Sequence, residues 1–115
     1  MRVSFEIVFA WVESMTESEF LSAVEQVWIE LEAWADRRVS QGEDIEVTRN
    51  GPVVELEFES GKKIVVNSQA PMKQIWLASP LGAFHYQWKA GAWRDTRSGK
   101  EFWQELENQA VLLAA

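Results

Sequence analysis

Residues 44–66 read DIEVTRNGPVVELEFESGKKIVV, and this segment carries the clearest structural signal in the chain. Apolar residues recur at every second position in each of its three runs, which is the spacing of β-strands with one buried face. Asn50-Gly51 and Ser60-Gly61 lie between the runs as tight-turn signals, and Asn-Gly predicts a type I′ hairpin. The stretch therefore predicts three antiparallel strands.

The alternating pattern continues towards the C-terminus. Pro71 ends the third strand, and further strands are expected at 74–79, 83–88 and 92–95, separated by Gly-containing turns. Alternation turns Ile75 and Leu77 inward. Their inward partners are all apolar or aromatic, which supports this register over a slip by one residue: Ile64, Val66, Phe84, Tyr86 and Trp88.

Helices are expected before and after these strands. Thr16 and Glu19 form a capping box, and a helix from about Glu17 to Arg38 follows with an apolar arc at helical spacing: Phe20, Leu21, Val24, Trp28, Leu31 and Ala35. A last helix from about Lys100 to Leu113 places on one side Phe102, Trp103, Leu106 and Ala110. A run of strands flanked by helices predicts an α+β fold.

The outer face of the predicted sheet has an acidic half and a polar, aromatic half. The first two strands present Asp44, Glu46, Glu55, Glu57 and Glu59. The next three strands present Asn67, Gln74, Trp76 and His85. A tryptophan among hydrogen-bonding side chains is typical of a protein-binding anchor. The alternative is a tryptophan that a long neighbouring side chain covers.

Carboxylates also align on the first predicted helix. Glu25, Glu32 and Asp36 are spaced by seven and four residues, so they share a narrow stripe beside the apolar arc. Three further acids just past the helix extend this stripe: Glu43, Asp44 and Glu46. Oxygen ligands suit hard cations, and an open ridge binds them weakly, at about micromolar affinity or poorer. The alternative is a solvated acidic helix face.

Composition excludes several functions. The chain has no cysteine, so it forms no disulfide and no thiolate-ligated zinc site or cluster. It has one histidine and no recognised catalytic motif, so we do not expect an enzyme. Residues 1–59 carry 14 acids and 4 bases, which argues against nucleic-acid binding. No apolar run is long enough for a membrane helix or resembles a signal peptide, so we expect a cytoplasmic protein.

The 115 residues fit one compact domain. The predicted elements begin after Met15, so we assign residues 15–115 to this domain. Residues 1–14 are set apart as an N-terminal extension without an assigned role, either an upstream start or a remnant of expression.

One segment resembles a known family. Residues 67–78 read NSQAPMKQIWLA and are similar to the frataxin signature N-x-Q-x-P-x-x-Q-x-W-L-A. Gly82-Ala83-Phe84-His85-Tyr86 and Trp93-Arg94-Asp95-Thr96-Arg97-Ser98-Gly99 support the resemblance, which spans Met15 to about Ala110 and points to the bacterial frataxin (CyaY) family. It implies a two-layer sandwich, in which an antiparallel sheet of five to six strands carries the N- and C-terminal helices on one face.

The resemblance also implies a function in iron-sulfur cluster assembly. Iron, ferrous or ferric, would bind weakly at a ridge formed by Glu32, Asp36, Asp44 and Glu46, with Glu25 and Glu43 beside them. This ridge is thinner than in many bacterial relatives, because residues 37–41 carry no acid. The partners implied are cysteine desulfurase and the scaffold protein, which would contact Asn67, Gln69, Gln74 and Trp76. Alternation adds His85 to this predicted partner-binding group.

Three interpretations remain within the family. The chain delivers iron to the scaffold as a metallochaperone, or it modulates the desulfurase without iron. The third interpretation is iron storage or ferroxidase activity in oligomers, which a Glu-x-x-His pair would support and which this sequence lacks. We expect a monomer, with iron-dependent oligomers as the alternative.

Overall fold

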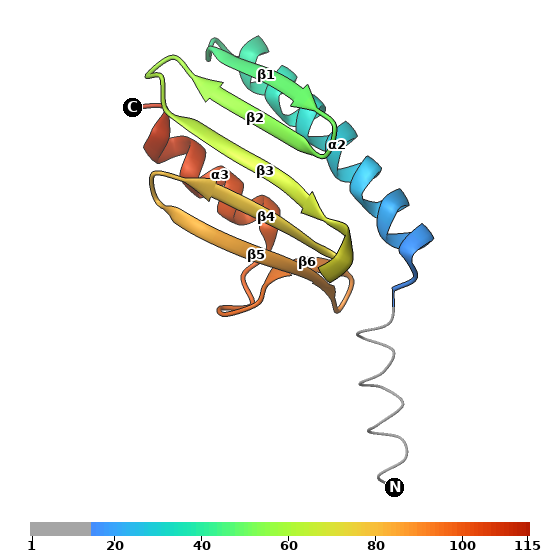
Figure 1. The fold of residues 1–115 in the computed structure, drawn as a ribbon. Coiled ribbons are helices and arrows are strands. Elements are labelled where there is room, and N and C mark those ends of the chain that lie inside the picture. The colour runs from blue at the N-terminus through green and yellow to red at the C-terminus, as the bar shows by residue number, and fades with distance from the viewer. Residues whose placement is uncertain (1–14) are drawn as a thin grey trace, which may run out of the picture.

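The computed structural model describes residues 15–115, so the segment 1–14 set apart above lies outside the described residues. Two helices flank six strands (Figure 1). The elements in chain order are α2 (Glu17–Ser40), β1 (Ile45–Asn50), β2 (Val53–Phe58), β3 (Lys63–Gln69), the 3-10 turn η1 (Ala70–Met72), β4 (Gln74–Ser79), β5 (Gly82–Lys89), β6 (Ala92–Asp95) and α3 (Phe102–Leu113).

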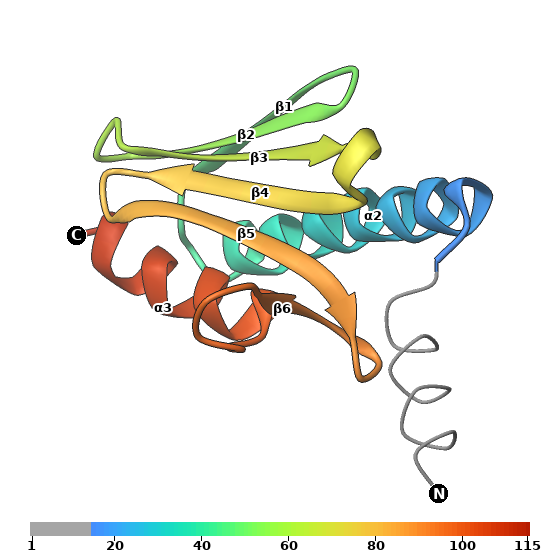
Figure 2. The same cartoon turned by 60° about the horizontal axis from the view of Figure 1, so that its bottom comes forward.

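The six strands form one antiparallel sheet in the order β1-β2-β3-β4-β5-β6. Figure 2 shows the sheet as one layer, with α2 and α3 together beneath one of its faces. The predicted α+β sandwich with both helices on one face is therefore confirmed, and the sheet has six strands. None of the helices formed by residues 15–115 is long and apolar enough to cross a membrane.

The core lies between the sheet and the helices. Ile75 and Leu77 are fully buried, as the predicted register requires, and each faces an inward residue of the neighbouring strands. Trp88 lies on the same side at the end of β5 and packs edge-on against Trp93, but it remains 39% exposed. It reaches the margin of the core rather than its interior.

The buried side of α2 differs from the predicted arc. Leu21 is 52% exposed, whereas Val27 and Trp34, which the arc omitted, are buried. The reason is that α3 packs beside α2 and covers its flank on the Trp34 side. The Trp34 Nε1–H donates to Glu107 Oε1 on α3 over 2.7 Å.

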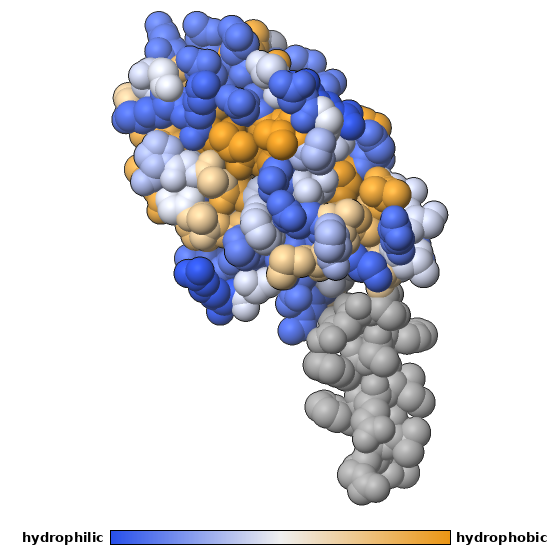
Figure 3. Space-filling view, in the orientation of Figure 1, coloured by the Kyte–Doolittle hydropathy of each residue, from blue (hydrophilic) through white to orange (hydrophobic). Residues whose placement is uncertain are grey.

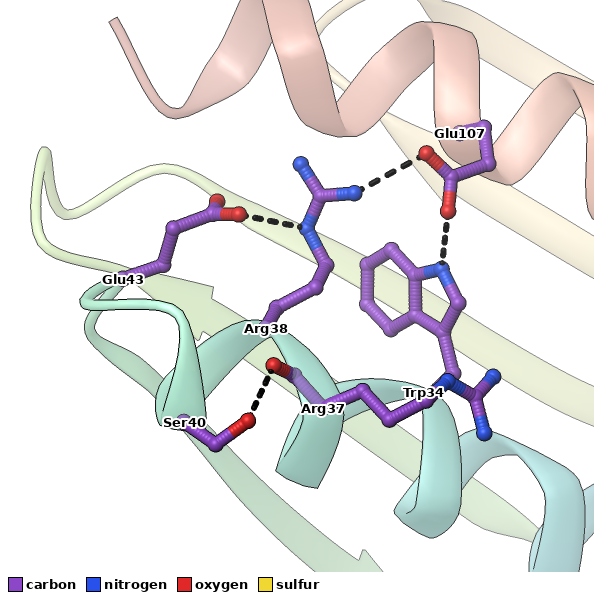
Figure 4. A network of polar contacts seen from close by, with 6 residues as sticks. All are labelled: Trp34, Arg37, Arg38, Ser40, Glu43 and Glu107. Carbon is purple, nitrogen blue, oxygen red and sulfur yellow. Dashed lines mark hydrogen bonds and ion pairs between the residues drawn. The ribbon is translucent and has the colours of Figure 1, made fainter.

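An arginine reinforces this contact between the helices (Figure 4). Arg38 Nη1 donates to Glu107 Oε2 over 2.9 Å, and the Arg38 guanidinium lies 5.0 Å from the centre of the Trp34 ring. Arg38 Nε also lies 3.0 Å from Glu43 Oε2, without the alignment of a hydrogen bond, so that contact is an ion pair only. Arg38 thus joins α2, α3 and the segment that leads into β1.

The element ends follow local hydrogen bonds. The Thr16–Glu19 capping box is present, which confirms the start of α2 at Glu17, and the helix runs two residues past the predicted Arg38. The last helix begins at Phe102 rather than Lys100, because the Glu101 carboxylate accepts from the first backbone N–H groups of α3.

The predicted type I′ turn between β1 and β2 is wrong. Asn50 pairs with Val53, so the central residues are Gly51 and Pro52. Gly51 has φ of +59°, but the proline ring holds φ negative at the second position, which type I′ does not allow. Glycine at the first central position fits type II′.

The turn between β6 and α3 is closed by a buried carboxylate. Asp95 Oδ2 accepts from the Ser98 backbone N–H over 2.9 Å and from the Ser98 hydroxyl over 2.7 Å. Burial alone raises the pKa of Asp95, but these hydrogen bonds outweigh it and hold the pKa below its usual value. The folded protein therefore binds this proton less readily than the unfolded chain.

This shift predicts a loss of stability in acid. The contribution of Asp95 is fully present above the unfolded pKa of about 4 and is lost as the pH falls through the lower folded value. Asp95→Asn should therefore lower the free energy of unfolding at pH 7 by about 1 kcal/mol and flatten its decline below pH 4. Urea unfolding at several pH values measures this. Asp36→Asn, on an exposed carboxylate, is the control, and an equal flattening in that variant would contradict the assignment.

Candidate functional site: an open sheet face beside an acidic surface

The sheet face opposite the helices collects the predicted partner-binding residues. Asn67 on β3 lies directly across from Trp76 on β4, which lies directly across from His85 on β5. Gln69 and Gln74 face each other in the next row. The structure therefore brings all five together. We name this group the amide–aromatic patch: Asn67, Gln69, Gln74, Trp76 and His85.

Two contacts fix the tryptophan of this patch. The Trp76 and His85 rings are stacked, with centroids 4.1 Å apart and planes 9° apart. The Trp76 indole N–H donates to Gln74 Oε1 over 2.8 Å. The ring is therefore half-buried by its neighbours rather than free, although no helix of residues 15–115 covers it. A tryptophan held in one orientation loses little side-chain entropy when a partner binds it.

A shallow hollow of about 160 Å³ adjoins the patch. Its remaining walls are apolar: Val65, Leu77, Ala78 and Ala83. Figure 3 shows the same arrangement on a larger scale, because hydrophobic colour gathers over the middle of the sheet and hydrophilic colour lies over β1 and β2. The open face thus has an apolar centre with hydrogen-bonding groups at its side.

Asn67 is the unusual member of the patch. Its Oδ1 is buried, and no group within residues 15–115 donates a hydrogen bond to it. A buried carbonyl oxygen without a donor costs stability. Asparagine is therefore a poor choice at this position for stability alone.

The six predicted ridge acids do not form one site. Glu25 pairs with Arg49 over 2.9 Å, and Glu43 pairs with Arg38 over 3.0 Å. The other four are exposed and make no ion pair within the described chain: Glu32, Asp36, Asp44 and Glu46. Two of the six acids therefore form ion pairs with arginines that are not adjacent to them in the sequence.

The four unpaired acids lie in two places. Glu32 and Asp36 are on α2, whereas Asp44 and Glu46 border a polar hollow of about 210 Å³ on the sheet edge. Glu57 and Glu59 also line this hollow, together with Phe58, and Glu46 faces Glu57 directly across the strands. Alternation had placed these two on the outer face, but cross-strand register was needed to bring them to Glu46. Within residues 15–115, no three acidic or histidine side chains converge closely enough to enclose a metal ion.

Comparison with known proteins identifies the family of this chain. The model of the frataxin-like domain matches residues 13–112. The chain belongs to the frataxin-like family. Proteins named iron-sulfur cluster assembly protein CyaY, from Burkholderia mallei and Burkholderia pseudomallei, are 45% identical over 97 residues, which is 84% of this chain and 90% of theirs.

Solved frataxins share the fold. The frataxin of Psychromonas ingrahamii is 34% identical, with a TM-score of 0.75 over 85% of this chain and 90% of that one. A trimeric frataxin of Saccharomyces cerevisiae is 26% identical, with a TM-score of 0.65 over 99% of this chain and 93% of that one. A second structure of the trimeric yeast protein, complexed with ferrous iron, gives 0.60 at 26% identity, over 89% and 88% of the two chains.

The unpaired side-chain oxygen of Asn67 can be used to test whether this residue stabilises the fold of this frataxin-like domain. Asn67→Leu removes the buried unpaired carbonyl and should raise the free energy of unfolding by about 1 kcal/mol. Urea unfolding measures it. Gln69→Leu, on a neighbouring amide of the same face without a buried unpaired oxygen, is the control and should give a smaller gain. A loss of stability in Asn67→Leu would show that the asparagine serves the fold.

Proposed function

We propose that the chain acts in iron-sulfur cluster assembly as a non-enzymatic cytoplasmic protein that docks on the complex of cysteine desulfurase and scaffold and carries iron weakly. The observation that carries this proposal is the amide–aromatic patch. It gathers side chains from residues 67–85 on a sheet face without a covering helix. The names of the relatives as cluster assembly proteins supply the pathway.

The patch has the chemistry of a protein-binding anchor. The Trp76–His85 stack presents a large rigid surface, and the amides of Gln69 and Gln74 offer hydrogen bonds at its edge. The adjoining apolar hollow supplies area that releases water when it is covered. Aromatic side chains surrounded by polar groups contribute most to affinity in protein interfaces.

The exposed acids on α2 and at the sheet edge support the proposal of weak iron binding. Glu32 and Asp36 are one turn apart on α2, and Asp44 and Glu46 face the solvent at the sheet edge. Pairs of open carboxylates leave most of the water on a hydrated cation, so we expect affinities of about micromolar or poorer. In this proposal iron is cargo that the protein passes on, and a loose site suits release.

A second candidate function, modulation of the desulfurase without iron, is favoured by a separate observation. Three exposed apolar residues lie on the same stripe of α2 as Glu32 and Asp36, namely Leu21, Ile29 and Val39, which are 52%, 59% and 47% exposed. Apolar side chains contribute nothing to a metal site. Interleaved with acids, they fit a protein surface that carries basic and apolar groups.

Calorimetric titration of cysteine desulfurase with the protein, with and without ferrous iron, tests both candidates. The test variant is Glu32→Lys/Asp36→Lys. We expect it to weaken the affinity for the desulfurase at least about tenfold, because it reverses two charges facing a basic partner. Added salt should weaken the wild-type complex in the same direction.

The control Glu17→Lys/Gln104→Lys/Asn108→Lys makes the same change in net charge at exposed positions outside this stripe and should bind nearly as the wild type does. A titration of iron alone separates the candidates, because only iron carriage requires the test variant to bind less iron than the wild type, the acids at the sheet edge being unchanged. Equal desulfurase affinity for the test variant and the control would overturn the docking role of this surface.

A further inference from the structure

A hollow on the helix side of the molecule has a distinct lining. It lies between α2, the β5–β6 hairpin and the start of α3, and it has a volume of about 230 Å³. Its walls carry three tryptophans and two glutamates and no basic side chain: Trp88, Trp93, Trp103, Glu30 and Glu101. We name it the tryptophan hollow. It continues past Glu30 and Trp103 into a second depression between the two helices.

The same protein already shows what this combination binds. Arg38 lies 5.0 Å from the centre of the Trp34 ring and pairs with Glu107. Arg49 lies 5.7 Å from the centre of the Trp28 ring. Its guanidinium pairs with Glu25 over 2.9 Å. In both groups an arginine bridges a tryptophan face and a carboxylate.

The tryptophan hollow has two of these three components. Glu30 is exposed and makes no ion pair within residues 15–115. The Glu101 carboxylate is held at the start of α3 by backbone N–H groups of Trp103 and Gln104, each over 3.0 Å. No cation of the described chain lies over Trp88, Trp93 or Trp103. The missing component is a cation.

The arrangement of the tryptophan rings in this hollow suits a bound cation. Trp88 packs edge-on against Trp93, with centroids 5.4 Å apart and planes 75° apart, and it remains 39% exposed. An edge-on pair leaves the ring faces pointing in different directions, as in sites that surround a cation. A guanidinium suits such a site better than an ammonium, because it is planar, less strongly hydrated and able to stack while it pairs with a carboxylate.

We propose that the tryptophan hollow binds an arginine side chain of a partner protein, with the guanidinium stacked on Trp88 or Trp103 and paired with Glu30. The site lies on the helix layer, away from the amide–aromatic patch on the open sheet face. A partner could therefore be held on both sides of the molecule.

Nuclear magnetic resonance of the indole N–H groups tests this with a defined probe. We would titrate the full chain with N-acetyl-arginine amide and, separately, with N-acetyl-citrulline amide, in which a neutral urea replaces the guanidinium. The arginine probe should shift the Trp88 and Trp103 signals along one binding curve. The citrulline probe should give less than about a fifth of that shift at equal concentration.

Two exposed acids of α2 provide the matched variants. Glu30→Gln should raise the dissociation constant of the arginine probe about threefold, whereas Glu17→Gln should leave it unchanged. Both changes are on the surface, so the fold is retained. Equal shifts with both probes, wild-type affinity in Glu30→Gln, or shifts confined to Trp76 would each overturn the proposal.

Discussion

Both helices cover the same face of the sheet, and this arrangement determines which side chains the other face exposes. Burying Ile75, Leu77 and their inward neighbours against α2 and α3 turns every alternate residue of the central strands towards the opposite side. Within residues 15–115 nothing packs on that side. The side chains there are free of the demands of the core, and polar groups such as Asn67 can be kept at some cost to stability.

The contact between the helices has a second consequence for the acidic surface. Arg38 is drawn to Glu107 and stacks on Trp34, and from that position it also reaches Glu43. Arg49 similarly takes Glu25. Arginines that stabilise the fold therefore form ion pairs with two of the six ridge acids, Glu25 and Glu43. What remains is an open surface of separate carboxylates, which suits a docking partner or a loosely held hydrated ion better than a closed metal site.

The sequence predicted much of this architecture because period-two patterns and turn residues are local signals. Strand register and the capping box of Thr16 and Glu19 followed from neighbours along the chain. Trp34 and Glu25 could not be placed in this way. Their partners, Glu107 and Arg49, are far away in the sequence, and only packing of α3 beside α2 and of β1 beside α2 brings them together.

Four members of the amide–aromatic patch were predicted as a group for the same reason, whereas Gln69 followed from the family resemblance. These four residues occupy alternate positions along β3, β4 and β5, so the two-residue period of a strand assigns them to one face. The alternation of residues along the strands did not reveal that His85 stacks on Trp76. Nor did it reveal that Asn67 Oδ1 accepts no hydrogen bond within residues 15–115, because both features depend on side-chain conformation. The type of the β1–β2 turn was missed through a local conflict, since Pro52 follows the Asn-Gly pair and forbids the conformation that this pair favours.

The proposal to be tested first is that the open sheet face makes the main contact with the desulfurase complex, and that the helix layer adds further contacts. Its most direct test records the indole N–H signals of the isotopically labelled protein while unlabelled cysteine desulfurase and scaffold are added. We expect the Trp76 signal to shift or broaden at the lowest partner concentrations, before the signals of the buried Trp28 and Trp93. A Trp76 signal that stays unchanged while the complex forms would contradict it.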